Sequence, residues 1–125
     1  MNTSTSTITY VPMLWPLPEP SGFRTPPPEA WAQGAVVFED AVTQTNKGQY
    51  ANAAETFLKA ATLLKTDIEN PYVQTLEAGR NAAYHNAYEC FMAAGKADAG
   101  KTRLQAIAKQ DLVMARSIEA ILAPP

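Results

Sequence analysis

The stretch GQYANAAETFLKAATLL, residues 48–64, decides the fold class of this chain. Its apolar residues recur every three or four positions, which is the spacing of one face of an α-helix. That apolar stripe is made up of Tyr50, Ala53, Ala54, Phe57, Ala60, Ala61 and Leu64. Gly48 stands where a glycine commonly ends a preceding helix. The stretch therefore predicts an amphipathic helix that is rich in small residues and follows a tight turn.

Three further segments show the same helical spacing. The helix ahead of Gly48 has the stripe Trp31, Ala35, Phe38 and Val42. The helix after Pro71, which ends at Gly95, has the stripe Val73, Leu76, Ala83, Ala87 and Cys90 or Phe91. The last helix, ahead of Pro124, has the stripe Leu104, Ile107, Ala108, Leu112, Ala115, Ile118 and Leu122. No segment alternates with a period of two, as a half-buried strand does, so we expect an all-α domain of four helices over residues 29–123.

The four predicted helices fall into two similar pairs. A shift of 47 residues places Gly48 on Gly95 and Phe57 on Leu104. It also pairs Tyr50 with Ala97, Ala53 with Gly100, Ala60 with Ile107, and Ala61 with Ala108. Repeated units of this size stack side by side and share one core. We therefore expect two stacked antiparallel helical hairpins.

Residues 48–64 resemble the turn and second helix of a tetratricopeptide (TPR) repeat. The matching positions are Gly48, Tyr50, Ala53, Phe57 and Ala60. The stretch YHNAYECFMAAG, residues 84–95, is similar to the first helix of a second repeat, through Tyr84, Ala87, Tyr88 and Phe91. The resemblance covers residues 30–122 and implies a scaffold or adaptor that binds another protein.

Two features depart from the TPR pattern. The first predicted helix has Asp40 and Gln44 where large apolar residues are usual. The 47-residue spacing also exceeds the length of a standard repeat, about 34 residues. The chain is thus TPR-like. Its second predicted helix also resembles MIT domains, which are three-helix modules that bind peptide helices, although the second hairpin argues against that family.

In TPR domains the partner usually lies in a concave groove formed by the first helix of each repeat. Carried over to this sequence, the resemblance implies groove residues Phe38, Val42, Thr45 and Asn46 from the first repeat and His85, Glu89 and Met92 from the second. These side chains favour an apolar partner segment, either extended or helical.

The N-terminal part of the chain has a different character. Residues 2–9 (NTSTSTIT) are small and polar, which predicts a disordered tail over residues 1–9. Residues 10–28 contain seven prolines, which exclude a helix or a central strand and predict an extended arm. The apolar anchors of this arm are Leu14, Trp15 and Leu17. Because so much apolar surface is rarely left exposed, we expect the arm to pack on its own helices, to join chains into a homo-oligomer, or to serve as a motif for a different protein.

Composition narrows the class of protein. The hydrophobic fraction of 46% and charged fraction of 18% are those of a globular domain. The net charge of −2 argues against a nucleic-acid binder, although residues 96–125 carry five basic against three acidic side chains, which favours an acidic partner segment. No run of eighteen apolar residues and no signal peptide is visible, so we expect a cytoplasmic protein without membrane insertion.

Few residues offer chemistry. The only histidine, His85, and the only cysteine, Cys90, lie five positions apart, about 140° around a helix, so they do not form a nucleophile and base. One His and one Cys also fall short of a metal site, and we expect neither catalysis nor a cofactor. The rival reading is a small-molecule or nucleotide-responsive regulator that uses GKADAGKT, residues 95–102, which has the spacing of a P-loop. A P-loop follows a buried strand, whereas a helix is predicted here.

Overall fold

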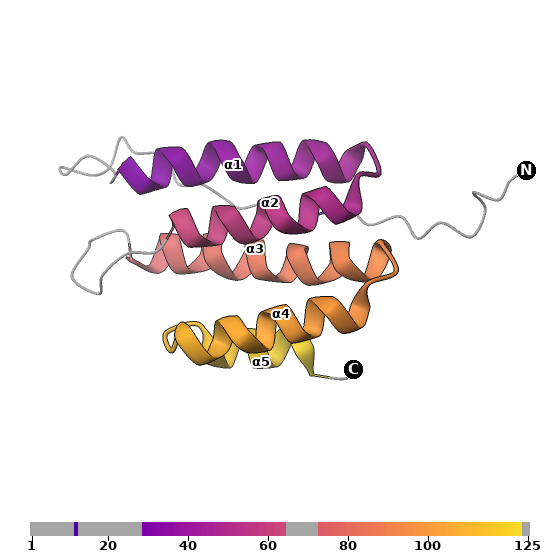
Figure 1. Ribbon diagram of the computed structural model, residues 1–125. Helices are drawn as coiled ribbons and strands as arrows, with labels where there is room; N and C mark the ends of the chain where they lie inside the picture. Colours follow the sequence, from indigo (N-terminus) through magenta and orange to yellow (C-terminus); the bar gives the residue numbers. More distant parts are fainter. Residues whose placement is uncertain (1–11, 13–28, 65–72, 124–125) are drawn as a thin grey trace, which may run out of the picture.

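The computed structural model describes residue 12, residues 29–64 and residues 73–123. These ranges contain the helices α1 (Glu29–Asn46), α2 (Tyr50–Leu63), α3 (Val73–Ala93), α4 (Ala97–Gln110) and α5 (Ala115–Leu122). No strand occurs within the described ranges, so the predicted all-α class is confirmed. Helices α1 to α4 lie side by side in chain order, and α5 folds back against α3 and α4 (Figure 1). The predicted tail, most of the arm and the anchors Leu14, Trp15 and Leu17 lie outside the described residues.

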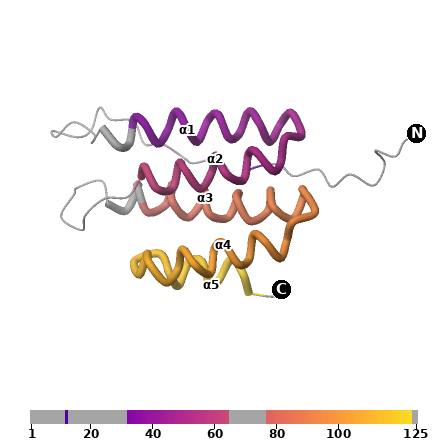
Figure 2. Tube along the Cα trace, in the orientation of Figure 1, coloured from indigo at the N-terminus to yellow at the C-terminus, as the bar shows by residue number. Residues whose placement is uncertain are grey.

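The turns that join α1 to α2 and α3 to α4 have the same geometry. Gly48 and Gly95 both have φ of +77°, a conformation that glycine adopts without steric cost. The amide of each glycine donates to the carbonyl three residues earlier, at 3.0 Å in both turns. The amide that follows donates to the carbonyl five residues earlier, at 2.9 Å from Gln49 and 2.7 Å from Lys96. Both turns are Schellman motifs at the same end of the molecule (Figure 2), and they recur at the 47-residue spacing of the sequence.

Helix α2 lies between α1 and α3 and supplies much of the core. All seven residues of its predicted stripe are buried, and Leu58 joins them. The ring of Phe57 packs edge-on against Phe38 of α1, with the ring centroids 5.2 Å apart. On α3, the described part of the predicted stripe is buried as well: Ala83, Ala87, Cys90 and Phe91. Helices α1, α2 and α3 thus meet through alanines, which permit a close approach, and through a few aromatic rings, which fill the remaining space.

The prediction of one continuous last helix is wrong. The chain leaves the helical path at Asp111, the residue that caps α4, and becomes helical again at Ala115. Leu112, which the helical spacing placed on the apolar stripe, is 78% exposed. Met114 and Ile118 return the chain to the core, where both are buried. The break turns α5 back so that it contacts α3 as well as α4.

Two leucines of the predicted stripe provide a test of this break. Leu104 has no exposed surface, so Leu104→Ala should lower the free energy of unfolding by about 2–5 kcal/mol. Leu112→Ala removes the same atoms from an exposed site and should change stability by less than about 0.5 kcal/mol. Urea denaturation followed by circular dichroism measures both. Equal losses would contradict the break at Asp111.

Two glycines mark close contacts between helices. A Cβ on Gly100 would lie 2.6 Å from Cβ of Phe91, an atom fixed to the backbone of α3. A Cβ on Gly34 would lie 2.4 Å from a terminal methyl and 2.6 Å from Cγ of Leu64, atoms of a side chain that has two rotatable bonds. Gly100→Ala should therefore destabilise the fold by about 1–3 kcal/mol, because the steric cost exceeds the gain from the better helix propensity of alanine. Gly34→Ala should cost clearly less in the same melt, and the reverse order would show that Phe91 yields more readily than Leu64.

Candidate functional site

A buried ion pair positions the C-terminal part of the domain. Arg80 of α3 donates from Nη2 to Oδ2 of Asp111, and both residues are buried. The hydroxyl of Tyr84 donates to the same carboxylate oxygen at 3.1 Å. Burial raises the pKa of Tyr84, although the nearby Arg80 opposes that shift, so the phenol stays protonated and serves as a donor. The three side chains tie the end of α4 to the middle of α3 and so fix where α5 begins.

A hollow of about 580 Å³ opens beside α3 because α5 returns to it. Its lining comes from three helices and consists of Tyr88, Glu89, Met92, Lys101, Ile121, Leu122 and Ala123. Most of these side chains are apolar, while Glu89 and Lys101 bring one charge of each sign. Such a lining suits an apolar ligand that also makes a few polar contacts.

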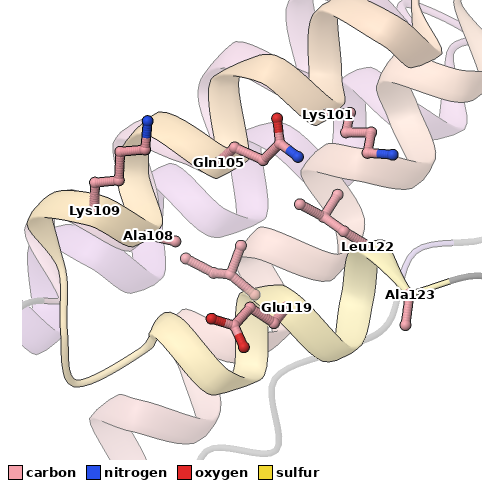
Figure 3. A pocket seen from close by; sticks show the side chains of 8 residues that line it. Lys101, Gln105, Ala108, Lys109, Glu119, Leu122 and Ala123 are labelled. Atoms are coloured by element: carbon pink, nitrogen blue, oxygen red, sulfur yellow. The ribbon is translucent and has the colours of Figure 1, made fainter.

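A second hollow of about 570 Å³ lies between α4 and α5 (Figure 3). Its lining consists of Lys101, Gln105, Ala108, Lys109, Ile118, Glu119, Leu122 and Ala123. Lys101, Gln105 and Lys109 follow one another along α4, and Glu119 projects from α5 across the hollow from them (Figure 3). The two hollows share Lys101, Leu122 and Ala123, so they flank the end of α5.

Two of the predicted groove residues lie in the core. Phe38 is 4% exposed and packs on Phe57, and Thr45 is 2% exposed. The Thr45 hydroxyl donates to the carbonyl of Ala41 at 2.8 Å and lies 3.5 Å from the sulfur of Cys90. Both residues therefore hold α1 against its neighbours and present no surface to a ligand, because α1 approaches α2 and α3 closely.

The other predicted groove residues reach the surface at several places. Val42 is half-buried and Asn46 is exposed on α1, and neither lines the hollow beside α3. His85 is half-buried on α3 and is also outside that lining. Glu89 and Met92 are half-buried and lie together in the hollow. The structure thus brings two of the seven predicted residues into one site, with Tyr88, Lys101 and α5 as additions.

The side chains that could act as nucleophiles or metal ligands are dispersed. Burial raises the pKa of the Cys90 thiol, which is fully enclosed and therefore a poor nucleophile at neutral pH. Among the described residues, no three His, Cys, Asp or Glu side chains gather as metal ligands. No helix in the described ranges has the length and hydropathy needed to cross a bilayer.

The GKADAGKT segment forms the turn after α3 and the first turns of α4. Gly95 has the positive φ of the Schellman turn, and Gly100 is buried where α4 approaches Phe91. Each glycine therefore has a packing or backbone role. The segment follows a helix, whereas a P-loop with the same spacing of glycines and lysine follows a strand.

Sequence reasoning missed Arg80, Asp111 and α5 as determinants of the site. A signal was present, because Arg80 stands three residues ahead of Ala83 in an otherwise apolar stripe. Asp111 likewise stands seven residues after Leu104 on the same face of the last predicted helix. Opposite charges at two stripe positions indicate a buried pair, since an unpaired charge there would be costly.

In the comparisons with known proteins, no family model, curated protein or solved structure matches this chain.

The buried ion pair leads to a stability prediction. Asp111→Ala leaves the charge of Arg80 buried without its partner, which should cost about 3–5 kcal/mol. Glu55→Ala removes the partner of Arg103 from an exposed pair and should cost no more than about 1 kcal/mol. The double change Arg80→Met with Asp111→Leu should recover most of the loss, because neither charge is then buried. Urea melts measure all three variants, and equal losses for Asp111→Ala and Glu55→Ala would contradict a structural role of the buried pair.

Proposed function

We propose that this chain is a non-catalytic protein–protein interaction module, a TPR-like scaffold or adaptor that binds an apolar segment. The observation that carries the proposal is the hollow between α3 and α5, where Glu89 and Met92 lie beside Ile121 and Leu122. These are the two residues of the implied groove that the fold brings together next to further apolar side chains. The ligand enters as an extended strand of peptide or as a short helix.

The lining of the hollow supports this class of ligand. Met92 is an adaptable apolar side chain, and Tyr88 offers a rigid ring with a polar end. Glu89 and Lys101 give the ligand two polar contacts of opposite sign, which set its orientation more than its affinity.

The repeated turn supports the TPR-like assignment. The same Schellman motif recurs at Gly48 and Gly95, and the helix that follows each glycine packs back on the helix before it. Small residues at these contacts include Ala53 and its counterpart Gly100, both of which are buried. Units of this design present a continuous surface to a partner segment.

The arm of the same chain is the first candidate for the bound segment. Its predicted anchors Leu14, Trp15 and Leu17 provide the apolar contacts that the hollow accepts. Pro12, the residue of the arm that the structure describes, is buried, which favours packing against the domain. In an assembly, the arm of one chain could occupy the hollow of another and so join two copies.

Fluorescence of Trp15 tests this proposal in the full-length chain. In a Trp31→Phe background, we expect Trp15 to emit at short wavelength and to resist quenching by acrylamide, because its ring is buried against the hollow. Met92→Glu should shift the emission to longer wavelength, because it places a charge in the apolar lining. Leu112→Glu adds the same charge at an exposed site away from the hollow and should leave the emission unchanged.

The emission of Trp15 also distinguishes an arm that binds its own domain from one that joins two chains and from one that is free to bind a different protein. A protected signal that persists on dilution means that the arm binds its own domain, and one that is lost on dilution means that it joins two chains. A Trp15 that is fully quenchable without Met92→Glu would contradict binding to the hollow. The arm would then be a motif offered to a different protein.

A further inference from the structure

The outer face of α1 is acidic and has an exposed apolar residue at its centre. Val36 is 62% exposed, and one turn further along the same face Glu39 and Asp40 are both exposed. Helix α1 contains three acidic residues and no basic one. Neither Glu39 nor Asp40 forms an ion pair within the described ranges. This face therefore carries negative charge beside an exposed apolar side chain, and Asp40 also borders a hollow that Lys47 and Lys59 line.

The opposite edge of the stack has the complementary character. Figure 1 shows α1 at one edge of the row of helices and α4 with α5 at the other. The hollow between α4 and α5 has Ile118 and Leu122 in its lining, and Lys101 and Lys109 stand eight residues apart along α4, about 12 Å. Glu119 is the single acidic residue of this lining.

The two ion pairs at this edge involve one basic and one acidic residue of the region 96–123, Arg103 and Asp111, and so leave its net charge unchanged. Arg103 is paired with Glu55, and Asp111 is paired with Arg80, so these four residues neutralise one another. The remaining charged residues of the region 96–123 are four basic and two acidic, a balance of +2: Lys96, Lys101, Lys109 and Arg116 against Asp98 and Glu119.

We propose that copies of this chain associate head to tail, with the outer face of α1 from one copy docked in the α4–α5 hollow of the next. An added helix would cover the apolar side chains of the hollow that reach the surface, with Val36 over Ala108 and Leu122. Glu39 and Asp40 would then meet the lysines of α4. The inference is separate from the proposed function, because the occupant is α1 and the hollow is the one that α3 does not line.

The geometry of the two edges determines the kind of assembly. The two surfaces differ from each other, so the contact is heterologous and leaves one edge of each kind free after every addition. The assembly grows by single copies unless the rotation between copies closes a ring. Opposite charges bring the edges together, so association weakens as salt screens them.

Sedimentation velocity of the full-length chain is the first test. We expect the average mass to rise above the 13.5 kDa of one chain as protein concentration increases. The rise should shrink between about 0.1 M and about 1 M sodium chloride, where the screening length falls from about 10 to about 3 Å. A chain that sediments as a monomer at every concentration would overturn the proposal, as would association that is insensitive to salt.

Charge reversal identifies the surfaces. Gln105→Glu with Lys109→Glu adds three negative charges to the α4–α5 hollow. Glu39→Lys with Asp40→Lys makes the exposed face of α1 basic. Each double variant alone should lose association, because like charges now face each other. A mixture of the two should regain it, because each altered edge finds a partner of opposite sign. Association of either variant alone, or a mixture that stays monomeric, would overturn the proposal.

A matched control makes the same change in charge elsewhere. Asn52→Glu with Lys96→Glu also adds three negative charges, at exposed positions that line neither the α4–α5 hollow nor the exposed face of α1. This variant should associate like the unmodified chain, and an equal loss would overturn the assignment to these surfaces. The charge-reversed positions on α1 and α4 are exposed, and circular dichroism checks that every variant keeps its helices. Association that survives reversal of the hollow would assign the contact to the arm instead.

Discussion

The ion pair between Arg80 and Asp111 is the constraint on which the C-terminal half of the structure depends. When two charges are buried together, the free energy of losing their hydration offsets much of their mutual attraction. The pair therefore adds little net stability, while it permits few other arrangements of the helices. Here it requires the end of α4 to lie over the middle of α3. After this pair the chain turns back, and α5 then lies beside α3 and α4 and forms the two hollows with them. We take conformational specificity to be the main contribution of the pair.

Much of the helical framework could be predicted from local sequence. The stripe of α2 and the glycines at 48 and 95 depend on periodicity and on a positive φ, and both are properties of a few neighbouring residues. The break after α4 was not predictable in this way, because Leu112 continues the helical spacing of Leu104 and Ile107. The residue at the break, Asp111, has its partner Arg80 31 residues away in the sequence, and periodicity within one segment cannot reveal such a contact.

The candidate site was predictable only in part, for a related reason. A family resemblance assigns residues to a groove by their position in a helix, and it assumes a standard distance between helices. Phe38 and Thr45 are buried because α1 lies close to its neighbours across small side chains such as Ala41. Glu89 and Met92 line a hollow because α5 stands beside them. The helix that completes the site is therefore the one that the sequence pattern did not separate from α4.

The contact between Thr45 and Cys90 gives the protein an intrinsic reporter of its own opening. The sulfur lies 3.5 Å from the hydroxyl on α1 and has no exposed surface, so an alkylating reagent reaches it only when the helices that cover it, α1 among them, separate. The labelling rate at low reagent concentration would then equal the intrinsic thiol reactivity multiplied by the open fraction. Since Cys90 is the only cysteine, no thiol has to be removed to read this equilibrium. A ligand that bridges α1 and α3 would slow the labelling, because it would hold closed the contact that covers the sulfur.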